Sequence, residues 1–149
     1  MGFFLQLQEG SDARLSLFVD TSVWSLAFRR DSPASAKEVA ALVAAIENDE
    51  TILTTGLVFQ ELLQGFSGPK HRNRILDRFS DVPLLAPDRE DHVGAAELRN
   101  RCRRNGVQIG TIDALLAQLC LRHDLTMLTA DNDFSHIADH SALRVWNHP

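Results

Sequence analysis

Four carboxylates spread along the chain have the residue type and placement to act together on a phosphate ester. Three of them, Asp20, Asp113 and Asp131, stand at or just past the end of a predicted strand or the start of a predicted helix, and the fourth, Glu61, lies about one turn into a predicted helix. Carboxylates that are pushed together repel one another unless cations neutralise them. Hard oxygen ligands favour Mg²⁺ or Mn²⁺, and these ions can activate water and stabilise the charge that develops during phosphodiester cleavage. The set therefore predicts a metal-dependent nuclease or phosphatase.

Each of these acids also has an ordinary structural explanation. Asp113 would lie in the first turn of a predicted helix, where the helix dipole favours a negative charge without any catalytic role. Taken singly, each acid is more often a helix cap or a solvated side chain than a catalytic group. The prediction of a site therefore depends on the joint pattern of the four.

The segment DNDFSHIADH at residues 131–140 looks at first like a self-contained metal site. It is a poor calcium loop, because the glycine and the glutamate expected at its sixth and twelfth positions are replaced by His136 and Ala142. We therefore interpret the segment as one corner of a larger carboxylate cluster. Asp131 is the expected participant, and Asp133 is an expected supporting acid.

The elements that must position these acids alternate along the chain. Short apolar or β-branched runs predict strands at residues 15–20, 51–55, 82–87, 125–129 and 143–147. Helical spacing predicts helices at residues 22–30, 32–48, 57–66, 69–81, 88–105, 111–124 and 135–140. This alternation favours an α/β domain with a mainly parallel central sheet of four to five strands flanked by helices.

Local signals mark several helix ends. Ser32 is the expected cap of the second helix, with Pro33 at its first position. Asp88 is expected to cap the long helix that Gly106 stops, and Thr111 to cap the next one. In parallel sheets, ligands bind beyond the carboxyl ends of the strands, at the switch in strand order. The expected elements therefore place Asp20, Asp113 and Asp131 near one crevice, with Glu61 joining from the side.

Length and composition set the limits of these predictions. The 149 residues suit a single domain over 15–149, preceded by an N-terminal extension at 1–14 of uncertain structure. No apolar run approaches the roughly 20 residues that a membrane span needs, and the start lacks the basic region of a signal peptide, so a cytoplasmic location is expected. The net charge of −5 argues against a nucleic-acid binder unless several of the carboxylates hold cations. Cys102 and Cys120 are expected to be small buried residues.

Four motifs, in order and at matching spacing, resemble the PIN-domain family and, within it, the VapC-type toxins of type II toxin–antitoxin pairs. The motifs are FVDTSVW at 18–24, FQELLQG at 59–65, GTIDALLAQLC at 110–120 and LTADNDF at 128–134. Each motif alone is weak, but four in order are fairly specific. The resemblance covers nearly the whole chain after the N-terminal extension.

The resemblance implies roles for particular residues. It implies that the metal ligands and catalytic acids are Asp20, Glu61, Asp113 and Asp131. It also implies supporting roles for the hydroxyl groups of Thr21 or Ser22 and of Thr129, and for Asp133.

The same resemblance implies a function. Family members are Mg²⁺-dependent endoribonucleases, with Mn²⁺ as a plausible substitute, and tRNA or rRNA is the expected substrate. They usually form homodimers, and a cognate antitoxin inhibits them, sometimes in a hetero-oligomer. Two alternatives stay open. One is a metal-dependent nuclease or phosphoesterase that is not a toxin, and the other is a degenerate PIN module that binds RNA or protein.

An arginine cluster precedes the third motif. Its members are Arg99, Arg101, Arg103 and Arg104. A ribonuclease with an acidic centre needs flanking positive charge to hold phosphates, so the cluster is a candidate RNA contact. Cations also stabilise a helix C-terminus, which could be the whole reason for the cluster.

Overall fold

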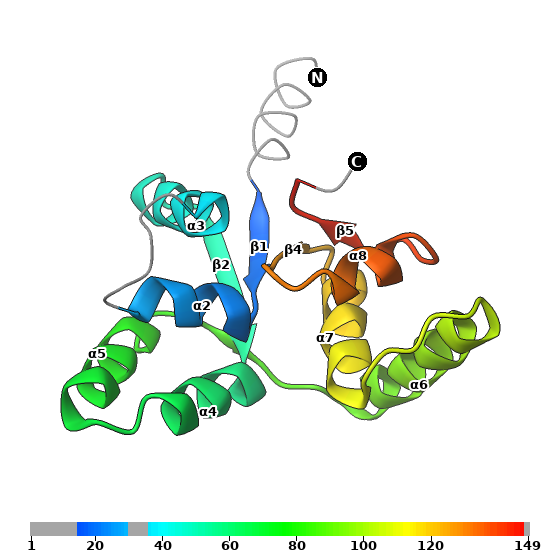
Figure 1. The fold of residues 1–149 in the computed structure, drawn as a ribbon, viewed down its shortest axis with the longest axis horizontal. Helices are drawn as coiled ribbons and strands as arrows, with labels where there is room; N and C mark the ends of the chain where they lie inside the picture. Colours follow the sequence, from blue (N-terminus) through cyan, green and yellow to red (C-terminus); the bar gives the residue numbers. More distant parts are fainter. Residues whose placement is uncertain (1–14, 30–35, 148–149) are drawn as a thin grey trace, which may run out of the picture.

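The computed structural model describes residues 15–29 and 36–147, which are built around a five-stranded sheet (Figure 1). The strands are β1 (Ser16–Val19), β2 (Thr51–Thr55), β3 (Leu84–Leu85), β4 (Thr126–Leu128) and β5 (Arg144–Val145). Their order is β3-β2-β1-β4-β5, and every neighbouring pair is parallel. The predicted mainly parallel sheet of four to five strands is therefore confirmed.

The central strand β1 supplies the middle of the core. Its residues Leu17, Phe18 and Val19 are almost completely buried, as expected of a parallel strand that is covered on both faces. Phe18 is in register with Leu53 of β2 on one side and with Met127 of β4 on the other. The short apolar run that predicted this strand is therefore buried on both faces because helices cover the sheet.

Seven helices are described in these parts of the chain. They are α2 (Thr21–Phe28), α3 (Lys37–Glu47), α4 (Gly56–Gly65), α5 (Pro69–Phe79), α6 (Arg89–Arg104), α7 (Thr111–Arg122) and α8 (Asp133–Ala138). In Figure 1, α2 to α5 lie on one side of β1, and α6 to α8 lie on the other. None of the described helices has the length and apolar character needed to cross a membrane.

The helix ends follow some of the predicted signals and not others. Asp88 caps α6 and forms a reciprocal capping box with Asp91, and Gly106 follows α6 in the left-handed region at φ 78°. The prediction for Thr111 is wrong, because α7 starts with Thr111 as its first residue and Gly110 is the N-cap. The predicted start of the second helix at residues 32–33 lies outside the described residues.

Helices α6 and α7 pack as an antiparallel pair that a buried carboxylate joins. The side chain of Asp91 is fully buried, and its Oδ2 accepts a hydrogen bond from Arg122 Nη1 at 2.5 Å. The same nitrogen lies 3.1 Å from Asp88 Oδ2, so the end of α7 is paired with the start of α6. The predicted buried cysteines contribute to this region, because Cys102 on α6 and Cys120 on α7 are free and buried.

Replacing Arg122 with glutamine should destabilise the fold much more than the same change at Arg144. Arg122→Gln leaves the buried Asp91 carboxylate without its cationic partner, and we expect a loss of about 2–3 kcal/mol. Arg144 pairs with Asp124, whose side chain is 88% exposed, so Arg144→Gln should cost less than about 1 kcal/mol. Urea unfolding of both variants measures the difference, and equal losses would contradict this account of Asp91.

Candidate active site

Asp20 stands where the central strand turns into a helix. Its backbone N–H still donates to the Leu128 carbonyl of β4 at 3.2 Å, while its side chain caps α2 by accepting from the Val23 N–H at 3.4 Å. The residue is only 5% exposed. Asp20 is therefore a buried carboxylate at the carboxyl end of β1, beside the end of β4 and at the predicted switch in strand order.

Two hydroxyl groups hold the Asp20 carboxylate from both sides. Ser22 Oγ donates to Oδ1 at 2.6 Å, and Thr129 Oγ1 donates to Oδ2 at 2.7 Å. The hydroxyl oxygens in turn accept from the backbone N–H groups of Ala130 and Asp131, each at 2.9 Å. The loop after β4 and the Asp20 carboxylate are therefore fixed by one network, in which Ser22, and not Thr21, supplies the hydroxyl beside Asp20.

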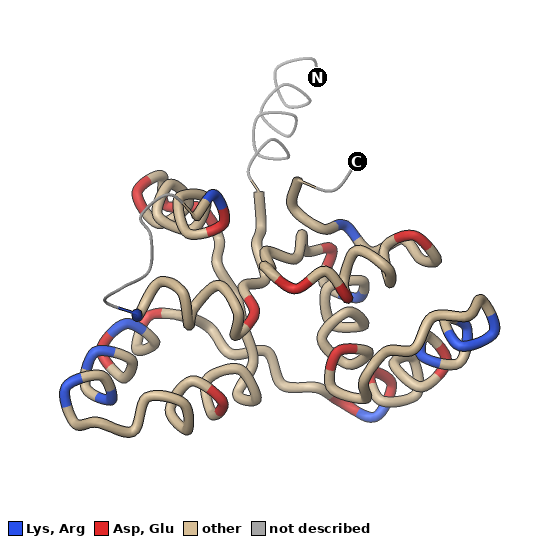
Figure 2. Tube along the Cα trace, viewed as in Figure 1, with Lys and Arg blue, Asp and Glu red and all other residues tan. Residues whose placement is uncertain are grey.

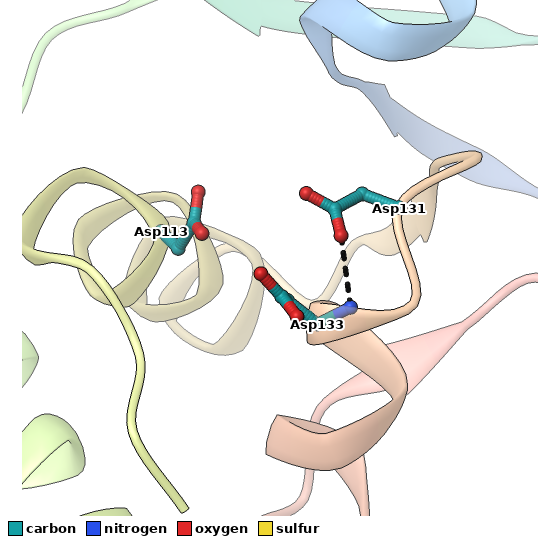
Figure 3. A group of neighbouring side chains, drawn as sticks. All are labelled: Asp113, Asp131 and Asp133. Atoms are coloured by element: carbon teal, nitrogen blue, oxygen red, sulfur yellow. Dashed lines mark hydrogen bonds between the residues drawn. The ribbon is translucent and has the colours of Figure 1, made fainter.

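Three further carboxylates converge beside this network, and the backbone of one of them, Asp131, is part of it. Asp113 comes from the first turn of α7, Asp131 from the loop after β4 and Asp133 from the start of α8, and Figure 3 shows their side chains turned toward one another. One carboxylate oxygen from each lies within 4.8 Å of the other two. The Asp133 N–H donates to Asp131 Oδ1 at 2.9 Å, which fixes the turn between these two acids.

This group differs in membership from the set that the sequence indicated. Asp133 was predicted only as a supporting acid, whereas its carboxylate lies in the three-residue group. Glu61, on α4, is exposed and lies outside that group, although its charge contributes to the pKa of Asp113. The spacing of two residues between Asp131 and Asp133 was the sequence signal that could have placed Asp133 in the group. A hydrogen bond across a turn of this length lets both carboxylates face one point.

The electrostatics of the site show how crowded the negative charge is. The pKa of Asp113 is raised to about 6, first by burial and then by the charges of four other acids, which are Asp131, Asp133, Asp20 and Glu61. Burial also raises the pKa of Asp20, although the hydrogen bonds from Ser22 and Thr129 oppose that shift. All five carboxylates therefore share one electrostatic environment that a cation would relieve.

The donor set fits a hard divalent cation. Asp131 and Asp133 are exposed and Asp113 is partly exposed, so an ion held by them could keep several of its waters. Carboxylate oxygens with open positions for water are the environment that Mg²⁺ and Mn²⁺ prefer. Asp20 is not a member of this group, and hydroxyl groups already set the orientation of its carboxylate.

The arginine cluster divides into two parts. Arg99 is partly buried, and its Nε donates to the Ile109 carbonyl at 2.9 Å. The other three members are exposed in the last turn of α6, where the helix dipole favours cations; they are Arg101, Arg103 and Arg104. Figure 2 shows this end of α6 at the periphery, a second group of basic residues on α5, and acidic residues between them.

Without a metal ion, the protein should become less stable as the pH rises from the ordinary pKa of an aspartate, 3.8, to the raised pKa of Asp113, about 6. In that range the folded state holds more protons than the unfolded state, so deprotonation favours unfolding. Thermal melts in the presence of a chelator should therefore show a steeper fall in Tm with pH for the wild type than for Asp113→Asn. Equal slopes for the two proteins would contradict the raised pKa.

The comparisons with known proteins agree with this geometry. The PIN domain family model matches residues 17–140. Among similar solved structures, VapBC-1 from nontypeable Haemophilus influenzae has a TM-score of 0.67 at 19% identity, covering 88% of this chain and 96% of that one. VapBC2 from Rickettsia felis, bound to a DNA fragment from its promoter, gives 0.68 at 20% identity, covering 88% and 97%.

A third similar structure is Mycobacterium tuberculosis VapC20, which is described as a toxin that cleaves the sarcin–ricin loop. It has a TM-score of 0.62 at 22% identity and covers 87% of this chain and 99% of that one. At these identities, the structural likeness establishes the fold. The family match covers most of the chain and includes Asp20, Glu61, Asp113 and Asp131. The chain therefore belongs to the PIN domain family.

Proposed function

We propose that this protein is a Mg²⁺-dependent endoribonuclease and the toxin component of a type II toxin–antitoxin pair. The observation that carries the proposal is the convergence of one carboxylate oxygen each from Asp113, Asp131 and Asp133 within 4.8 Å, in a PIN domain whose buried Asp20 interacts electrostatically with Asp113. Such a cluster is unfavourable unless it has a cation to hold, so a role in binding one explains why the fold maintains it.

Each residue of the site would have a separate role in phosphodiester hydrolysis. Asp113, Asp131 and Asp133 would hold the ion, and the charges of Asp20 and Glu61 would add to the negative potential of the site. A bound Mg²⁺ supplies an activated water and offsets the charge that develops on the phosphate. Ser22 and Thr129 keep the Asp20 carboxylate in one orientation, so it need not reorganise during the reaction.

The expected partners follow from the similar structures. The Haemophilus and Rickettsia proteins are VapBC complexes, and the Mycobacterium toxin cleaves the sarcin–ricin loop. By analogy, we propose a cognate antitoxin that inhibits this protein, a homodimeric toxin and a structured RNA substrate such as tRNA or rRNA. Basic residues on α5 and at the end of α6 lie on both sides of the acidic centre in Figure 2, where they could contact RNA phosphates.

Removing one carboxylate of the site should abolish RNA cleavage. Asp113→Asn and Asp131→Asn each lose a charged oxygen that the proposed ion needs, and we expect Mg²⁺-dependent cleavage to fall by at least about 100-fold. Glu97→Gln, an exposed change on α6, is the matched control and should cleave like the wild type. A gel assay with RNA, DNA and a phosphate monoester makes the measurement.

The same substrates separate the proposal from its alternatives. Cleavage of DNA or of the monoester, but not of RNA, would favour a nuclease or phosphoesterase that is not a toxin. A wild type that binds RNA or protein without cutting any substrate would favour a degenerate module. Sequencing of RNA ends after expression without the antitoxin would identify the cut site if the toxin proposal holds.

Asp133 should matter more than Glu61 for binding the ion itself. Asp133→Asn removes a member of the three-carboxylate group, so we expect Mn²⁺ affinity to fall by about tenfold in the absence of RNA. Glu61→Gln changes an exposed acid outside that group and should have a smaller effect. Mn²⁺ titration followed by electron paramagnetic resonance measures both, and the reverse order would show that Glu61 is the closer ligand.

A further inference from the structure

Three contacts join α6 to α7 and to the loop before it, at different points along the helix pair. At the far end from the site, Arg122 pairs with the buried Asp91. In the middle, Gly94 lies so close to Gln118 that an added Cβ would meet its side chain at 2.5 Å. At the end nearest the site, Arg99 Nε donates to the Ile109 carbonyl. These contacts fix the position of α7 along α6 from one end to the other.

The last of these contacts leads directly to the candidate metal ligand on α7. Ile109 precedes Gly110, the N-cap whose carbonyl accepts the Ala114 N–H at 3.0 Å and so begins the helix. A Cβ built on Gly110 would lie 3.9 Å from Asp113 Oδ2. The carbonyl that Arg99 holds, the N-cap and the Asp113 carboxylate are therefore contiguous.

Packing holds part of the start of α7, because Ile109 and Ala114 are buried in the core. No side chain caps this helix, unlike α2, α4 and α6, whose N-caps all accept a backbone N–H. Residues 105–110, which connect α6 to α7, contain neither helix nor strand. A charged donor on a backbone carbonyl makes a strong hydrogen bond. Here that bond anchors the residue before the N-cap, although it does not satisfy the first N–H groups of the helix.

We propose that Arg99 is a positioning residue for the acidic cluster. By holding the Ile109 carbonyl, it fixes the first turn of α7 so that Asp113 faces Asp131 and Asp133. This inference rests on the proposed function, because the purpose of the alignment is to bind a divalent ion. It separates Arg99 from its neighbours on α6, with which the sequence had grouped it as a candidate RNA contact.

Three variants of the full chain test the proposal. Arg99→Gln shortens the side chain and removes its charge, Arg99→Lys keeps a cationic donor, and Arg103→Gln is the matched control because Arg103 is exposed in the last turn of the same helix. Two measurements made without RNA report on position. They are hydrogen exchange of the first turn of α7, with the amides of β1 as internal reference, and Mn²⁺ affinity by electron paramagnetic resonance.

We expect Arg99→Gln to exchange the Ala114 amide about tenfold faster and to bind Mn²⁺ about tenfold more weakly, while the β1 amides remain protected. Arg99→Lys should lie between Arg99→Gln and the wild type, and Arg103→Gln should match the wild type. If Arg99→Gln also exposes the β1 amides, the variant is unfolding and Arg99→Lys becomes the test. For Arg99→Lys we still expect faster exchange confined to the first turn of α7, together with weaker Mn²⁺ binding.

Two results would overturn the proposal. One is unchanged exchange and Mn²⁺ affinity with weaker RNA binding, which would make Arg99 an RNA contact. The other is a wild type that does not bind Mn²⁺ at all. If instead the wild type binds Mn²⁺ but cuts no RNA, and the Arg99 variants still weaken that binding, the proposed ribonuclease function fails while the positioning role holds.

Discussion

The cost of gathering several carboxylates in a partly buried site is the constraint on which the rest of the structure depends. The pKa of Asp113 rises to about 6, first because of burial and then because of the charges of its neighbours, and the pKa of the buried Asp20 is raised as well. Such a cluster destabilises the folded protein at neutral pH, so other parts of the fold must offset it. The buried centre of the sheet and the paired helices α6 and α7 supply that support.

The strand order explains how acids distant in sequence meet at one point. Because β1 lies between β2 and β4, its carboxyl end adjoins the end of β4, and the chain leaves these two strands into separate segments. One segment begins with Asp20 and the other leads to Asp131 and Asp133. Thr129 and Ser22 connect the two through Asp20, so the topology and the hydroxyl network together hold the separate pieces in place.

The sequence predicted most of the fold because the signals were local. A short apolar run is enough to indicate a buried strand, and the capping role of Asp88 needs only its own helix. Thr111 was assigned wrongly because residue type suggested a cap, whereas the backbone of Gly110 already occupies that position. The contact of Arg99 could not be predicted, because it depends on how α6 packs against the loop before α7.

The charge distribution explains how a protein with a negative net charge could bind a polyanion such as the proposed RNA substrate. The net charge of −5 describes the whole chain, but a phosphate responds mainly to charges within about 8 Å, the Debye length at physiological salt. Several acids are gathered in the centre, where bound cations would neutralise them, and basic residues extend along α5 and the end of α6 (Figure 2). A nucleic-acid backbone that crosses the acidic cluster would therefore meet positive charge on both sides. The sign of the net charge is a poor guide to nucleic-acid binding when the acids themselves form a cation site.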